Sequence, residues 1–156
     1  MREALEEILF KEFPILYKNH RRCFEHGDGW FLILLNLSMK LEPFVLQFKE
    51  EVRDQFQVGV VKEKFGLLRF DCDFPLEDEI IRERMYAFIN EAEDQSAITC
   101  EACGQAGTHR KTSWLHVHCN PCEEARVAKS KADMKKWKEE TDARKLEKSL
   151  REVNKP

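Results

Sequence analysis

Two short cysteine motifs decide the fold of this chain, Cys100-Glu101-Ala102-Cys103-Gly104 and Cys119-Asn120-Pro121-Cys122. Together they have the form C-x2-C-x15-C-x2-C, which is a spacing typical of zinc sites. Two residues between thiolates let a tight turn direct both sulfurs at one ion, and two such turns complete a tetrahedron. Gly104 stands where such a turn often needs a left-handed residue. The motifs predict one structural Zn²⁺ bound by Cys100, Cys103, Cys119 and Cys122.

Other cysteine chemistry fits this pattern less well. A redox dithiol needs only one C-x2-C pair, and disulfides are rare in a reducing compartment. Three histidines remain alternative ligands: His109, His116 and His118. Because four thiolates already complete the coordination shell, we expect these imidazoles at the surface or beside the ligands. Cys23 and Cys72 lie outside the motifs and are predicted to be buried structural thiols.

Hydrophobic periodicity predicts an α+β core over residues 1–97. A helix is expected over residues 2–13, and a second helix should begin near Trp30 with Asp28 as its cap. The second helix is apolar on nearly every side, which indicates a place at the centre of the core, and Pro43 should break or kink it.

An antiparallel hairpin and another helix complete that predicted core. Alternating apolar residues over 56–61 and 68–74 indicate two strands, and Gly66 can supply a positive φ between them. Helical spacing returns over residues 76–97, with one apolar face made by Ile81, Met85, Phe88, Ile89 and Ala92. The hairpin should pack against the helices of residues 30–53 and 76–97.

The segment after Cys122 has a different composition. Residues 123–156 carry 11 basic and 8 acidic residues, a net charge of +3, whereas residues 1–122 carry 15 and 21, a net of −6. We expect a charged C-terminal helix over 123–156 that either breaks near Thr141-Asp142 or presents two apolar faces. The predicted organisation is a core (1–97), a zinc knuckle (98–122) and this helix. Without metal, residues 98–122 should unfold and the helix should lose its orientation.

Composition and missing motifs exclude several classes. Of the 156 residues, 42% are apolar, which is enough for a hydrophobic core. The net charge of −3 is unlike that of a generic DNA-binding protein, which is usually basic. The most apolar stretch, 30–46, contains Lys40 and Glu42, so we expect no membrane span. The acidic N-terminus lacks an apolar signal region, and we therefore expect a cytoplasmic protein. The deaminase, metalloprotease, hydrolase-elbow and P-loop motifs are missing, which together with a closed metal shell argues against an enzyme.

Two surfaces are candidates for partner binding. The first is a cluster of five carboxylates within nine residues, made by Asp71, Asp73, Glu77, Asp78 and Glu79. It is either a solvated loop and helix start, where acidic residues suit the helix dipole, or a patch that binds a basic protein. In the tail, Trp137 is a candidate interface anchor if it is exposed. Four tail lysines share one helical side and offer phosphate contacts as an alternative to a solvated face: Lys131, Lys135, Lys138 and Lys145.

Three segments carry a resemblance. They are Gly27-Asp28-Gly29-Trp30, the run from Lys62 to Phe70 (KEKFGLLRF), and the cysteine motifs with Trp114. In this order they resemble a family of small phage and prophage proteins over roughly residues 10–122, in which the four cysteines match a zinc knuckle one by one. A glycine commonly stands in that family at the position of Ser113. The chain also resembles, more loosely, the zinc-containing anti-CRISPR proteins that inhibit type II effector nucleases.

These observations lead to one functional expectation and one alternative. The resemblance implies a phage-encoded inhibitor in a bacterial host, whose acidic body binds a defence nuclease and blocks loading of target DNA. The alternative is a nucleic-acid-binding zinc-ribbon protein that uses the tail lysines.

Overall fold

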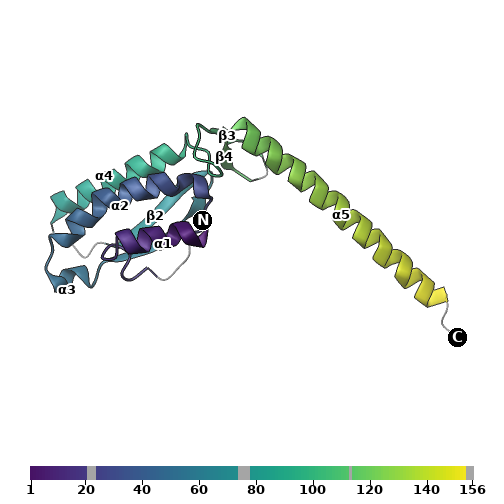
Figure 1. Cartoon of the computed structure of the whole chain (residues 1–156), viewed down its shortest axis with the longest axis horizontal. Coiled ribbons are helices and arrows are strands. Elements are labelled where there is room, and N and C mark those ends of the chain that lie inside the picture. The colour runs from purple at the N-terminus through teal and green to yellow at the C-terminus, as the bar shows by residue number, and fades with distance from the viewer. Residues whose placement is uncertain (21–23, 74–77, 113, 154–156) are drawn as a thin grey trace. The chain divides into compact units, whose positions relative to one another are not determined.

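The computed structural model describes residues 1–20, 24–73, 78–112 and 114–153, with side chains up to residue 149. Within these residues the fold is α+β, as predicted, with two small antiparallel hairpins among the helices. The elements are α1 (Glu3–Glu12), the 3-10 turn η1 (Asp28–Trp30), α2 (Phe31–Leu46), α3 (Glu50–Arg53), β1 (Gln57–Lys64), β2 (Leu67–Asp73), α4 (Glu79–Ser96), β3 (Thr108–Arg110), β4 (His116–His118) and α5 (Asn120–Val153) (Figure 1).

The chain forms two compact units, Met1–Cys119 and Asn120–Pro156. The first unit contains every element from α1 to β4, and the second is built from α5. The first three predicted ligands therefore belong to the same unit as the core, and Cys122 lies in the first turn of α5.

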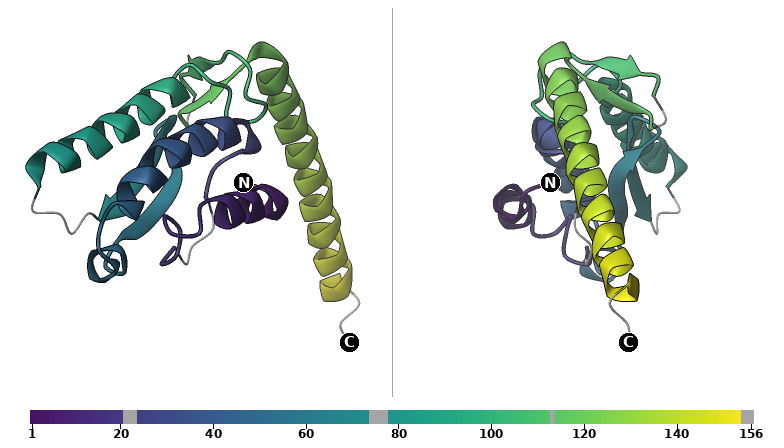
Figure 2. Two further views of the ribbon diagram at one scale, coloured as in Figure 1. Left: turned by 60° about the vertical axis from the view of Figure 1, so that its left-hand side comes forward. Right: turned by 90° about the vertical axis from the view of Figure 1, so that its right-hand side faces the viewer.

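Helix α2 supplies much of the core of the first unit. Its buried side chains include Leu34, Leu37 and Leu41, and it packs against α4, which presents the predicted apolar face. Figure 2 shows these two helices beside the β1–β2 hairpin, and β2 contacts α4 directly. Burial of the apolar sides of two helices and a hairpin in one cluster provides the main favourable term in folding this unit.

The apolar character of α2 also satisfies the criteria for a membrane span. Asp28–Leu46 has a mean hydropathy of 1.4 over its best window, of which 44% is buried inside the fold. The core helix of a globular unit meets the same test of length and composition, so this finding is weak support for a span.

The structure corrects two predictions about α2. Asp28 does not cap the helix, because its carboxylate accepts the backbone N–H of Arg2 at 2.7 Å and pairs with the Arg2 side chain. Of the two effects predicted for Pro43, a break is excluded, because the helix continues through Pro43 to Leu46. Proline removes one N–H donor and crowds the carbonyl four residues earlier, and burial of Leu41 and Val45 on either side offsets this cost.

The β1–β2 hairpin is confirmed and closes through a tight turn. Lys64 pairs with Leu67, so Phe65 and Gly66 are the only two turn residues, and their φ angles are 57° and 82°. Gly66 has the positive φ that the sequence predicted. The positive φ of Phe65 was not predicted, because a bulky side chain rarely adopts this conformation.

Helix α5 is continuous from Asn120 to Val153. This excludes one of the two predicted alternatives, a break near Thr141-Asp142, and leaves the helix with two apolar faces. The Thr141 hydroxyl donates to the carbonyl of Trp137 within the helix. Ion pairs between successive turns support the helix, among them Lys136 with Glu140 at 4.0 Å.

Candidate metal centre

The four predicted ligands come together in one cluster. Their sulfur atoms all lie within 4.8 Å of one another, and the Sγ atoms of Cys103 and Cys119 are 3.6 Å apart. A tetrahedron with Zn–S bonds near 2.3 Å has sulfur–sulfur edges of about 3.8 Å, whereas a disulfide bond is only about 2.05 Å long. The cysteines are free thiols placed to bind a single metal ion.

The backbone of the first motif forms the turn that this placement needs. The carbonyl of Cys100 accepts the N–H of Gly104 at 2.8 Å, and the N–H of Cys100 donates to Gln105 at 2.7 Å. Gly104 has a φ of 77°, which a residue with a Cβ adopts only with strain. The role predicted for Gly104 is confirmed.

The environment of Cys100 favours a thiolate. Burial opposes ionisation, but backbone N–H groups of Cys119, Cys103 and Ala102 outweigh it and lower the pKa of Cys100 to about 7. Thiolates bind metal, and thiols do not. The cluster therefore holds its most buried sulfur near the protonation state that a metal ligand requires.

The knuckle is fixed to the core by direct backbone packing against the segment that precedes α2. The N–H of Gly29 donates to the carbonyl of Glu101 at 2.7 Å. A Cβ at Gly29 would lie 2.2 Å from the carbonyl oxygen of Cys100 and 2.4 Å from the nitrogen of Gly104. Only glycine allows this close approach. The Gly27-Asp28-Gly29-Trp30 motif therefore positions the metal loop.

Side chains reinforce this attachment from both sides. Trp30 is fully buried, and its indole N–H donates to the carbonyl of Thr99 at 2.9 Å, immediately before the first ligand. The carboxylate of Glu101 accepts the N–H of Gly27 at 2.8 Å. Burial raises the pKa of Glu101. Sequence reasoning missed Glu101, because only its place between the first two ligands made it distinctive.

The three histidines lie near the knuckle in different surroundings. His116 is buried, and its Nδ1 lies 2.8 Å from the carbonyl of Trp114. Its ring lies 4.6 Å from that of His118 on the same side of β4. His109 is exposed in β3, and its Nε2 lies 3.1 Å from the carbonyl of Phe65 in the hairpin turn. Of the two predicted places, the surface therefore holds for His109, whereas burial of His116 excludes the surface and leaves the predicted place beside the ligands.

The predicted acidic cluster divides into parts with different roles. Asp71 and Asp73 are exposed on β2. Asp78 is the N-cap of α4 and accepts the N–H of Ile81 at 3.1 Å, and Glu79 pairs with Arg82 at 3.7 Å. All four described acids are exposed, but Asp78 and Glu79 stabilise the start of α4, whereas no such role is seen for Asp71 and Asp73 on β2. Glu77 lies outside the described residues, as does Cys23.

The remaining predicted residues lie on α5 or at the edge of the core. Trp137 is 60% exposed, as an interface anchor would need to be. Lys135 and Lys145 are near carboxylates of their own helix, at 3.9 Å from Glu139 and 4.0 Å from Asp142. Cys72 is half-buried against the core, and burial raises the pKa of its thiol.

Comparison of the chain with protein-family models, with curated proteins and with solved structures gave no match. The resemblance to phage proteins therefore stays a prediction.

Proposed function

We propose that this chain is a zinc-stabilised binding module in which the metal holds a recognition surface in shape and takes no part in chemistry. The observation that carries this proposal is the cluster of four sulfur ligands. Four thiolates complete the tetrahedral shell of Zn²⁺ and leave no position for a reactive water. Soft sulfur donors in this arrangement favour zinc over the hard cations.

The position of the cluster supports a structural role for the metal. Glu101, which lies between the first two cysteines, is hydrogen-bonded to both neighbouring segments. Its carbonyl accepts the N–H of Gly29 in the Gly27–Trp30 segment at 2.7 Å, and its N–H donates to the carbonyl of Val117 in β4 at 2.9 Å. Metal binding then contributes directly to the folding free energy of this end of the unit.

The partner that we propose is a protein with a basic surface, in its most specific form the nucleic-acid channel of a type II CRISPR effector nuclease in a bacterial cell. The net charge of −6 over residues 1–122 supports an acidic docking body, and Asp71 and Asp73 supply exposed carboxylates on one strand. Complementary charge would guide the two proteins together and compete with target DNA.

A cleavage assay tests this proposal. The zinc-loaded full chain is added to a guide-loaded type II effector nuclease, and cleavage of target DNA is followed at increasing inhibitor concentration. We expect inhibition that Asp71→Lys with Asp73→Lys weakens at least tenfold. The matched control is Glu50→Lys with Glu51→Lys, the same change of charge on exposed acids of α3.

Two outcomes would count against the proposal. In the first, the wild-type chain neither binds the nuclease nor inhibits cleavage. In the second, both double variants lose inhibition equally. The first result removes this partner, and the second reduces the effect to net charge.

A further inference from the structure

The tip of the β1–β2 hairpin carries a strained and exposed aromatic residue. Phe65 has a φ of 57° and is 68% exposed. Two-residue hairpin turns with two positive φ angles normally use Asn-Gly, and a bulky residue there costs about 1–3 kcal/mol. Because the ring is exposed, it gains no burial energy that would offset this cost. Such an outlier points to a function for the side chain.

The rest of the structure holds this tip rigidly. The carboxylate of Glu63 accepts the N–H of Gly66 at 2.5 Å, and the His109 ring lies 3.1 Å from the carbonyl of Phe65. A Cβ on Gly66 would lie 2.5 Å from Nε2 of His109, so the turn and β3 are closely packed. The backbone that carries the exposed Phe65 ring is therefore held in place from both sides.

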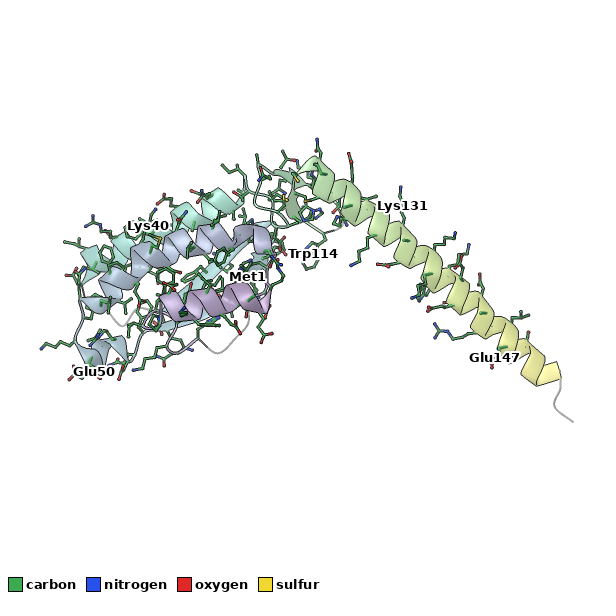
Figure 3. The ribbon with its side chains drawn as sticks, viewed as in Figure 1. Met1, Lys40, Glu50, Trp114, Lys131 and Glu147 are labelled. Carbon is green, nitrogen blue, oxygen red and sulfur yellow. The ribbon has the colours of Figure 1, made fainter. Side chains whose placement is uncertain are left out.

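A groove of about 670 Å³ lies beside this ring, and a second exposed aromatic residue lines it. Trp114 is 68% exposed on the segment before β4, next to the half-exposed Leu115. Figure 3 shows Trp114 at the surface of the first unit. Two large, exposed aromatic side chains thus line one open groove, where a ligand can reach them.

Two lysines of β1, Lys62 and Lys64, line the same groove. In the part of the chain that the structure describes, neither forms an ion pair with a carboxylate within 4.0 Å, and the Lys64 ammonium lies 5.7 Å from the centre of the Phe65 ring. Glu25 and Glu63 also line the groove, but the carboxylate of Glu63 is bonded to the turn.

We propose that this groove binds single-stranded nucleic acid, with bases stacked on Phe65 and Trp114 and phosphates close to Lys62 and Lys64. Stacking platforms flanked by cations are how proteins bind single strands without reading their sequence. In a duplex the base faces are covered by their neighbours, so a double strand should bind more weakly. The inference goes beyond the proposed function, since it uses neither Asp71 nor Asp73, and it differs from phosphate binding by the lysines of α5.

The test uses the zinc-loaded full chain and a fluorescein-labelled deoxythymidine 12-mer, with binding followed by fluorescence polarisation. Phe65→Asn is the decisive variant. It removes the ring but places the favoured Asn-Gly pair in the turn, so affinity should fall about tenfold while the thermal midpoint rises or stays the same. Trp114→Ala should lower the affinity by a similar factor, since each stacked base contributes about that much.

Charge and position supply the remaining measurements. Lys62→Gln with Lys64→Gln should flatten the slope of log affinity against log salt by about 1.4, the value for two lost phosphate contacts on a single strand. Tyr86→Ala is the matched control, because this tyrosine is also an exposed aromatic residue but lies on α4, outside the groove, and it should leave the affinity unchanged.

Three results would overturn the inference. They are an absence of binding by the wild-type chain at low salt, an affinity that Phe65→Asn and Trp114→Ala leave unchanged, and tighter binding to the duplex form of the probe. Loss of nuclease inhibition by the Asp71 and Asp73 variant has no bearing on this test, so the two proposals fail separately.

Discussion

Substitution of Gly29 by alanine should weaken the metal centre, although Gly29 is not a ligand. An added Cβ would lie 2.2 Å from the carbonyl oxygen of Cys100, 2.4 Å from the nitrogen of Gly104 and 2.7 Å from the nitrogen of Cys103. All three are backbone atoms of the knuckle, so no flexible side chain can move aside. Overpacking of this kind costs about 1–3 kcal/mol, and we expect a value close to 3.

The cost should be shared between folding and metal binding. To relieve the contacts, the backbone that carries Cys100 and Cys103 must move away from the segment before α2. If the whole cost falls on the metal-bound state, zinc affinity drops about 100-fold, since 1.4 kcal/mol corresponds to a factor of ten. If it falls on the fold, the thermal midpoint drops by roughly 10 °C.

Two assays on the same variant measure both shares. Competition with a chromophoric chelator gives the zinc affinity, and thermal unfolding with saturating zinc gives the stability. Gly59→Ala is the matched control, because its Cβ would meet nothing nearer than 3.5 Å, and a glycine in a strand gains slightly from replacement by alanine. If Gly29→Ala matches the wild-type chain in both assays, the backbone packing inferred for the knuckle is wrong.

Three further predictions concern the same end of the first unit. Removal of zinc by a chelator, or Cys103→Ser, should lower the thermal midpoint and abolish stoichiometric zinc in elemental analysis, because the metal contributes folding energy. Trp30→Phe should cost about 2–3 kcal/mol in urea unfolding, since it leaves the carbonyl of Thr99 without its indole donor and opens a cavity. Burial lowers the pKa of His26 to about 4, against about 6.5 in the unfolded chain, so this residue should contribute its full stability above pH 6.5. That stability should fall by about 1.4 kcal/mol per pH unit as the pH drops toward 4, and the difference in urea midpoint between the wild-type chain and His26→Leu at pH 7 and 5.5 measures the effect.

Local patterns were sufficient for most of the elements. The apolar spacing of Met85, Ile89 and Ala92 predicts α4, and the structure buries that face. The alternation around Val58 and Phe70 predicts the hairpin, which pairs β1 with β2. Both patterns are reliable because a helix or strand repeats its geometry over a few neighbouring residues.

Features that depend on distant parts of the chain were missed. Asp28 is suitable as a helix cap by its type, but Arg2 takes its carboxylate from 26 positions away. The sequence likewise does not predict the exposure of Trp114 or the strained backbone of Phe65, since both depend on how other segments pack around these residues. The two residues of the proposed groove come from segments almost fifty positions apart.

The sequence by itself identified the four cysteines that the fold brings together, because two C-x2-C turns already place each pair of thiolates near one point. Only the tertiary structure decided how the knuckle is anchored and what it displays. The Gly29 contact, the Trp30 bond to Thr99 and the groove beside Phe65 arise where separate segments meet through space, and the distances that make them possible are set by packing of the whole unit rather than by the order of neighbours along the chain.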